Sequence, residues 1–293
     1  MSESDLDVPR SSSTLPATVL AALGPDGPVL ADPDAPLLRA DDPGVLRGES
    51  VFESLRLAAG RPAFLHRHLR RLEVSAERLG LELPGGWEAL VELAVGAWAR
   101  PAGVLRLVCS RGGTAYALVT AIPPENAQAR ALGIRVVTLD LGVPAGLRAH
   151  APWLLGGVKS TSYAVNMAAQ REARRIGADD AVLLSSDGEV LEAPTATVAW
   201  VVAGRLVTPP PQAVGILAGI TMEVVLELCD ERGIGYEVRR GTVAELRAAD
   251  EVLLAGSIRG IAPVVALDER TLAIGPVTAG LRDSFEQRVL RAE

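Results

Sequence analysis

The chain shows two hydrophobic periodicities, one of period two and one near 3.6 residues. Short apolar runs separated by Gly and Pro over 15–60 predict strands. Apolar residues at three- and four-residue steps over 65–79 predict a helix that Gly80 ends. A second helix is predicted at 87–99, and two strands around a Gly-Gly turn at 103–122. Strands and helices therefore mix along the first part of the chain.

The same mixture continues beyond a polar, proline-bearing segment at 122–131. Here a strand is followed by a long loop at 144–157 that leads to Lys159. The dipeptide Asp187-Gly188 lies between two apolar runs and predicts a hairpin, since it suits the positive φ of a two-residue turn. Further on, a helix is predicted at 219–233. We expect two α/β lobes with a cleft between them.

The domain boundaries follow from composition. The polar, acidic segment 1–14 lacks the apolar core of a signal peptide, and we expect a disordered lead-in. An N-terminal α/β domain is predicted at 15–121, a linker at 122–131 and a larger C-terminal domain at 132–293.

Composition narrows the possible functions. A net charge of −7 without long basic runs argues against a nucleic-acid partner, and no apolar run approaches the ~20 residues of a membrane helix. Cys109 and Cys229 lack metal-ligand spacing and suit a reduced compartment, so we expect a cytoplasmic protein without a metal. His66 and His68 lie in a basic helical pattern, which indicates an exposed surface.

Lys159 is unusual because the other basic residues are all arginine. A guanidinium stays protonated in proteins, whereas a lysine amine can lose its proton and attack a carbonyl. The composition therefore indicates that Lys159 is retained for its chemistry.

Six motifs place Lys159 in a wider pattern. In chain order they are LRGESVFESLR, HLRRL with SAERL, VKSTSYAVN, VLEAPTATVAW, GITMEVV and EVLLAGSIRGIAPV. Together, over about 40–280, they resemble the class-IV (fold-type IV) aminotransferase family, whose members use pyridoxal 5'-phosphate. The resemblance implies a two-lobed α/β (α+β) enzyme with a smaller N-terminal α/β domain and a larger C-terminal pseudo-barrel domain. It also implies a homodimer that acts on small molecules.

The resemblance assigns roles at the reactive end of the cofactor. Lys159 matches the Schiff-base lysine, and Glu192 matches the glutamate that faces the pyridine nitrogen. The sequence departs from the family's EGxxSN pattern after Glu192, with Ala193, Pro194 and Thr197 at the next motif positions. Tyr163 is either a donor to the cofactor's phenolic oxygen or a core residue.

The resemblance also assigns a phosphate site. Arg71 of HLRRL matches the phosphate-binding arginine, and a guanidinium suits bidentate contact with phosphate oxygens. Ile220 and Thr221 begin a predicted helix, where unpaired N–H groups favour an anion. Ser257 and Ile258 match the other half of the phosphate cup.

The choice of reaction depends on substrate-facing residues. Ser54 occupies a place where aminodeoxychorismate lyases carry a hydroxyl, and such a group could protonate a leaving enolpyruvyl oxygen. The stretch SRGGTAYALV lacks the Arg-x-His pair of D-amino-acid enzymes. Arg111, Arg148 and Arg259 are candidates to bind the substrate carboxylate.

We therefore expect a 4-amino-4-deoxychorismate lyase that releases pyruvate and 4-aminobenzoate, a folate precursor. A D-amino-acid or branched-chain amino-acid transaminase is the first alternative. An inactive scaffold that binds pyridoxal phosphate without turnover is the second.

Overall fold

A computed structural model describes residues 16–291 of the chain, so the predicted lead-in at 1–14 lies outside the described residues. Six antiparallel strands form the first sheet in the order β2-β1-β6-β5-β3-β4. The strands are β1 (Thr18–Gly24), β2 (Gly27–Ala31), β3 (Ser50–Ala58), β4 (Arg61–Pro62), β5 (Gly103–Ser110) and β6 (Ala115–Thr120). The helices α2 (Leu65–Leu79) and α3 (Trp87–Trp98) follow their predicted bounds closely.

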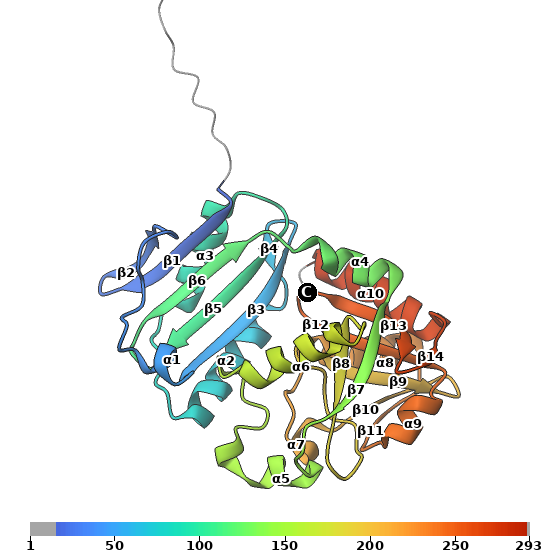
Figure 1. The fold of residues 1–293 in the computed structure, drawn as a ribbon. Helices are drawn as coiled ribbons and strands as arrows, with labels where there is room; N and C mark the ends of the chain where they lie inside the picture. The colour runs from blue at the N-terminus through green and yellow to red at the C-terminus, as the bar shows by residue number, and fades with distance from the viewer. Residues whose placement is uncertain (1–15, 292–293) are drawn as a thin grey trace, which may run out of the picture.

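The core of this half lies between the sheet and its two long helices. Alternate residues of β3 and β5, such as Leu55 and Leu105, pack against Leu72 of α2 and Leu90 of α3. The opposite face of the same strands is turned toward the rest of the molecule (Figure 1). Side chains alternate between the faces of a strand, so one face of β3 and β5 packs in this core and the other face forms a second surface.

The second sheet is mixed, in the order β11-β10-β9-β12-β13-β7-β8, with β14 paired to β13. Its strands are β7 (Ile134–Asp140), β8 (Asp180–Leu184), β9 (Thr197–Val202), β10 (Arg205–Thr208), β11 (Tyr236–Val238), β12 (Glu251–Gly256), β13 (Gly260–Leu267) and β14 (Arg270–Thr271). The helices α8 (Ile220–Arg232) and α10 (Pro276–Arg291) contribute to its core, with Val225 and Phe285 buried against Leu253. Both sheets are curled, which confirms the expected two-lobed α/β fold (Figure 1).

The remaining helices lie in the connections, and all but α6 have nine residues or fewer. They are α1 (Pro43–Leu46), α4 (Pro124–Leu132), α5 (Ala145–His150), the 3₁₀ helix η1 (Pro152–Leu154), α6 (Ala164–Arg175), α7 (Pro211–Val214) and α9 (Val243–Ala248).

Two connections differ from a simple reading of the sequence. The segment 122–131 is mostly α4, and Arg130 donates from Nη1 to the carbonyls of Ile258 and Arg259 at 3.3 and 2.9 Å. The expected loop at 144–157 contains α5 and η1, so that prediction was wrong in part. Both helices begin at or beside a proline, whose fixed φ favours a first helical turn. The division into domains at 122–131 stays a prediction.

The segment that carries Lys159 joins the two halves. Phe52 N donates to the Lys159 carbonyl at 3.1 Å, and Thr161 N donates to the Ser50 carbonyl at 2.9 Å. Lys159 N also donates to Ser75 Oγ of α2 at 3.2 Å. Hydrogen bonds of its backbone therefore fix Lys159 beside the N-terminal end of β3.

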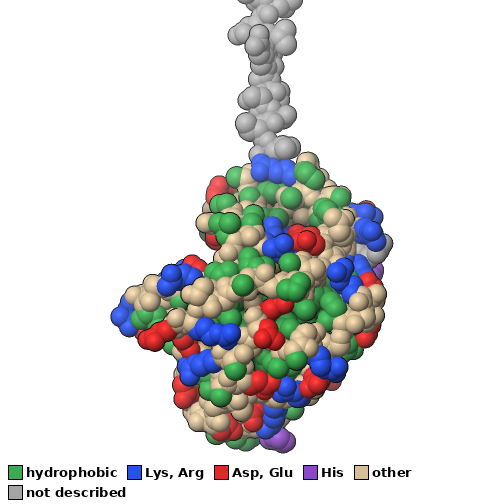
Figure 2. Space-filling model, turned by 90° about the vertical axis from the view of Figure 1, so that its right-hand side faces the viewer, with side chains coloured by type: hydrophobic (Ala, Val, Ile, Leu, Met, Phe, Trp, Pro, Cys, Tyr) green, Lys and Arg blue, Asp and Glu red, His purple; other side chains and the backbone are tan. Residues whose placement is uncertain are grey.

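The distribution of surface charge and the length of the helices are relevant to nucleic-acid and membrane partners. In the face drawn in Figure 2, acidic and basic side chains are interspersed, and the basic ones form no continuous area. Within residues 16–291, none of the helices has both the length and the apolar character needed to cross a membrane.

Candidate active site

One cavity of about 940 Å³ brings together the residues that the sequence singled out. Its lining comes from both sheets, from the start of α8 and from the turn between β12 and β13. The predicted residues that line it are Ser54, Arg71, Lys159, Glu192, Ile220, Thr221, Ser257 and Ile258. A space of this size is within the usual range for small-molecule sites. Tertiary contact thus unites residues spread over some two hundred positions of the chain.

The Lys159 amine lies in an aromatic corner of the cavity. Its Nζ is 3.4 Å from the Tyr163 hydroxyl and 4.4 Å from the centroid of the Phe52 ring. Burial lowers the pKa of Lys159 to about 8, although the nearby Glu53 carboxylate opposes the shift. The amine is therefore far more often neutral near pH 7 than an ordinary lysine.

The Glu192 carboxylate reaches the cavity from the predicted hairpin. Leu191 N donates to the Leu183 carbonyl and Leu183 N donates to the Glu192 carbonyl across the turn, where Gly188 has φ of 80°. Glu192 Oε2 accepts a hydrogen bond from Leu217 N at 3.2 Å, and Arg148 Nη1 lies 3.5 Å from Oε1. Burial raises the pKa of Glu192, and the charge of Arg148 opposes that rise. The departure from the family motif after Glu192 does not remove its side chain from the cavity.

Arg71 and the start of α8 lie close together at another part of the cavity wall. Arg71 Nη1 donates to the Ala218 carbonyl at 2.8 Å, just before α8 begins at Ile220. The Gly219 carbonyl accepts the Glu223 N–H as the first helical hydrogen bond, so the N–H groups of the first turn have no partner inside the helix. A guanidinium beside a helix N-terminus favours a bound anion such as phosphate.

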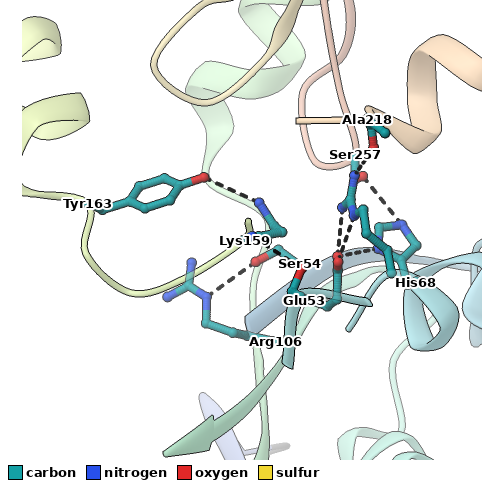
Figure 3. A network of polar contacts seen from close by, with 10 residues as sticks. Glu53, Ser54, His68, Arg106, Lys159, Tyr163, Ala218 and Ser257 are labelled. Atoms are coloured by element: carbon teal, nitrogen blue, oxygen red, sulfur yellow. Dashed lines mark hydrogen bonds and ion pairs between the residues drawn. The ribbon is translucent and has the colours of Figure 1, made fainter. Parts of the chain in front are cut away.

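A buried carboxylate that the sequence analysis missed holds Arg71 in place. Glu53, fully buried, accepts from Arg71 Nε and Nη2 at 2.7 and 2.8 Å. Its Oε2 also lies 2.6 Å from His68 Nδ1, and His68 Nε2 lies 3.4 Å from Ser257 Oγ. Burial alone would raise the pKa of Glu53, but Arg71 and His68 outweigh it and hold the pKa at about 2. Figure 3 shows this network on one side of Lys159.

The expectation that His68 is exposed was wrong. His68 is buried, with 1% of its surface accessible, whereas His66 is exposed. The helical period explains the difference, because His68 shares the face of Arg71 and Leu72, three and four residues on. Glu53 likewise lies on the face of β3 that points toward α2, the face that also carries apolar residues two positions before and after it. In the sequence, the available signal was an ionisable residue at a position where the helical or strand pattern places a core residue.

The three candidate carboxylate-binding arginines have different positions. Arg111 pairs with Glu49 and donates to the carbonyls of Leu79 and Gly80, so it caps the end of α2 and is not among the cavity-lining residues. Arg148 and Arg259 both line the cavity. A fourth arginine, Arg106 of β5, also lines it and was not among the predicted candidates.

Comparison with known proteins agrees with this arrangement. The sequence profile of the family described as amino-transferase class IV matches residues 50–267. A Mycobacterium tuberculosis protein named bifunctional aminodeoxychorismate lyase / D-amino acid transaminase is 38% identical over 270 residues, which cover 86% of this chain and 93% of that protein.

Solved structures extend the similarity to the fold. A hypothetical aminotransferase from Mycobacterium tuberculosis, in its PLP-bound form, superposes with a TM-score of 0.88 at 36% identity, covering 94% of this chain and 100% of that one. A fold IV-transaminase from Curtobacterium pusillum has a TM-score of 0.85 at 38% identity, covering 93% and 99%.

Pyridoxal phosphate, the cofactor of such enzymes, fits the residues around the cavity. The Lys159 amine, the Glu192 carboxylate and the Arg71 guanidinium beside the α8 N-terminus are the kinds of group that would hold its aldehyde, ring nitrogen and phosphate.

Proposed function

We propose that this chain, which belongs to the class IV amino-transferase family, is a pyridoxal-phosphate-dependent 4-amino-4-deoxychorismate lyase. The products are pyruvate and 4-aminobenzoate, a folate precursor. The observation that carries the proposal is that the Ser54 hydroxyl and the Lys159 amine line the same cavity. An acid and a base that face one substrate are what a 1,2-elimination requires. The name of the 38% identical relative, which includes this lyase activity, supports it.

When bound, the cofactor supplies an aldehyde for the substrate amine and a ring that withdraws electrons. Lys159 then acts as the base, because burial lowers its pKa to about 8 and its amine is neutral far more often near pH 7 than that of an ordinary lysine. The proton comes from the ring carbon that bears the substrate's amine. Ser54 donates a proton to the oxygen of the enolpyruvyl group as its bond to the ring breaks. The substrate thus divides into pyruvate and 4-aminobenzoate without an oxidant or reductant.

The other residues orient and polarise. Arg71, held by Glu53, and the first turn of α8 bind the phosphate. Glu192 keeps the ring nitrogen protonated, and Arg148 stabilises the Glu192 carboxylate at 3.5 Å. Ile258 and Ser257 close the phosphate site from the β12–β13 turn.

Replacing Ser54 with Ala tests the acid. We expect Ser54→Ala to lower kcat for 4-aminobenzoate formation by about 100-fold, since general acid catalysis is worth roughly 10²–10⁴-fold. Ser54→Thr keeps the hydroxyl and should retain most of the rate. Absorbance at the 4-aminobenzoate band measures the product. The proposed function is wrong if the wild-type enzyme, supplied with cofactor and aminodeoxychorismate, forms no 4-aminobenzoate.

A transaminase of D-amino acids or branched-chain amino acids is the second candidate. Two observations favour it: the relative's name includes D-amino acid transaminase, and a 38% identical structure is a fold IV-transaminase. Conversion of a keto acid in a second half-reaction distinguishes it from the lyase. An inactive scaffold is less consistent with a buried amine whose pKa is lowered to about 8, and turnover in either assay excludes it.

We further propose a cytoplasmic homodimer. Large apolar side chains are exposed around the cavity mouth, among them Leu154 and Val165, which line the cavity, and the neighbouring Trp153. Apolar surface of this kind is typical of protein contacts. Sedimentation velocity at micromolar concentration should give about twice the 30.6 kDa chain mass, and a monomer would contradict the proposal.

A further inference from the structure

A line of buried polar contacts ends on a residue of the cavity wall. It runs from Glu53 on β3 through His68 on α2 to Ser257 in the β12–β13 turn (Figure 3). The Glu53 Oε2 and His68 Nδ1 atoms are 2.6 Å apart, and the His68 Nε2 and Ser257 Oγ atoms are 3.4 Å apart. Ser257 lines the cavity, whereas His68 is buried and is not among the lining residues. The Ser257 hydroxyl therefore connects a buried imidazole to the proposed phosphate site.

The ionised state of Glu53 decides which nitrogen of His68 carries the proton. Burial would raise the pKa of Glu53, but Arg71 and His68 hold it at about 2, so near pH 7 the group is a carboxylate that only accepts hydrogen bonds. The His68 nitrogen that faces it, Nδ1, must therefore donate. Burial lowers the pKa of His68, although the Glu53 carboxylate opposes the shift. In the cofactor-free protein His68 is thus mostly neutral near pH 7, and its Nε2 is an acceptor.

A neutral His68 constrains the Ser257 hydroxyl. The hydroxyl has one proton, and it must donate that proton if it is to form a hydrogen bond with an unprotonated Nε2. It then presents only lone pairs to a phosphate, whose oxygens also accept. If His68 is protonated, Nε2 donates to Ser257 Oγ, and the hydroxyl proton is free to go to the phosphate. A bound phosphate dianion therefore favours the imidazolium form of His68.

The balance of charge leads to the same result. Glu53 and Arg71 already balance one another, because they form a bidentate pair at 2.7 and 2.8 Å. A phosphate group adds a charge of about −1.5 to −2 near pH 7. The ionisable groups that act on His68 are Glu53, Arg71 and Lys159. Arg71 is already charged, and the Lys159 amine is used by the cofactor aldehyde. His68 is the member of this group that can gain a positive charge at neutral pH.

We propose that His68 is a positioning residue that takes up a proton when the cofactor phosphate binds and thereby turns the Ser257 hydroxyl toward that phosphate. The inference rests on the phosphate site of the proposed function and is the same for a lyase and a transaminase. The proton comes from bulk water, and no covalent bond to carbon or phosphorus forms or breaks. The Glu53 carboxylate, which accepts from Nδ1, stabilises the imidazolium. One buried carboxylate thus supports two cations that act on the phosphate.

The protonation state of His68 can be measured by ¹⁵N NMR of enzyme labelled in its three histidines. His66→Gln and His150→Gln, both at exposed positions, assign the other two signals. Near pH 7 we expect one protonated ring nitrogen on His68 in the cofactor-free enzyme and two after pyridoxal phosphate is added. Pyridoxal has the same aldehyde without the phosphate, and it should leave His68 neutral.

Variants test whether this proton contributes to binding. His68→Asn keeps an amide N–H for Glu53 but is too short to reach Ser257. We expect it to weaken pyridoxal phosphate binding by about 10-fold, the lower end of the range for a hydrogen bond to a charged group, and pyridoxal binding by less than about twofold. Ser257→Ala should have the same selective effect, and Ser257→Thr, which keeps a hydroxyl, should lose less. His66→Asn, on the exposed face of α2, is the matched control. Absorbance titration of each cofactor form measures these affinities.

The outcomes separate this inference from the proposed function. The inference is overturned if His68 carries the same number of protons with and without pyridoxal phosphate, if pyridoxal protonates it equally, or if His68→Asn weakens both compounds to the same extent. Equal binding of the two compounds by the wild type would refute the phosphate site and this inference together. Turnover of aminodeoxychorismate is measured separately. An enzyme in which His68 gains its proton but which forms no 4-aminobenzoate would support the inference and refute the lyase.

Discussion

Replacing Lys159 with Ala should abolish both lyase and transaminase turnover, with a loss of at least about 10⁴-fold. The size follows from the two roles proposed for one amine, nucleophile toward the cofactor aldehyde and base toward the substrate. Lys159→Arg should be equally inactive, because a guanidinium remains protonated and does not condense with an aldehyde. Assays of product formation with both variants measure the effect.

A chemical readout independent of turnover supports the same prediction. Borohydride reduction of the cofactor-loaded wild type should attach the cofactor to the peptide that contains Lys159, and the chain has no other lysine to compete. A label on another residue, or a fully active Lys159→Ala enzyme, would refute the assignment.

The pH dependence of the Lys159 amine has a defined direction. Burial lowers its pKa from 10.5 to about 8, so in the cofactor-free protein the neutral amine is present above pH 8 and is lost as the pH falls through 8. Its rate of modification by acetic anhydride should rise to a half-maximum near pH 8. Peptide mapping separates it from the N-terminal amine. A half-maximum near 10.5 would show that burial does not shift the pKa.

Replacing Glu53 with Gln should lower both the stability of the fold and the affinity for pyridoxal phosphate. Glu53 is buried and binds Arg71 and His68, so its neutral substitute leaves the partly buried Arg71 guanidinium without this counter-charge. Removal of one partner from a buried ion pair typically costs about 3–5 kcal/mol. We expect a loss of this order in the free energy of unfolding. The phosphate affinity should fall as well, because Arg71 is no longer held in a bidentate pair.

The pH dependence of unfolding reveals the sign of the contribution that Glu53 makes to the free energy of unfolding. The pKa of Glu53 is lowered from 4.5 to about 2 in the fold, so its stabilisation is complete above pH 4.5 and is lost as the pH falls toward 2. Urea unfolding of the wild type and Glu53→Gln at pH 7 and pH 3 should show the difference narrowing at the lower pH. The exposed Glu73→Gln on α2 is the matched control. Equal stability of wild type and Glu53→Gln at pH 7 would contradict the role of Glu53.

Much of the fold could be predicted from local pattern. The helix at Leu65–Leu79 shows the 3.6 period and ends at Gly80, whose φ of 62° suits glycine. The hairpin around Gly188, which has φ of 80°, is likewise local. Each depends on residues close together in the chain, which is why the sequence is sufficient.

Local pattern was less informative about connections. The segment at 144–157 has no long apolar period, and its short helix α5 packs near Gly215 and Gly156. A Cβ at Gly215 would lie 2.6 Å from Arg148, so close approach of distant backbone decides the path of that segment. The sequence contains no sign of which glycine meets which loop.

The sequence by itself determined the order of elements, the unique amine at Lys159 and a list of residues that could surround it. Only the tertiary structure decided which arginines are neutralised: Arg111 pairs with Glu49 and caps α2, whereas Arg106 faces the cavity without a carboxylate partner among residues 16–291. The physical reason is that a charge acquires its role from the groups it meets. Those groups, such as Glu53 for Arg71, lie on other elements, and the packing of the two sheets brings them together.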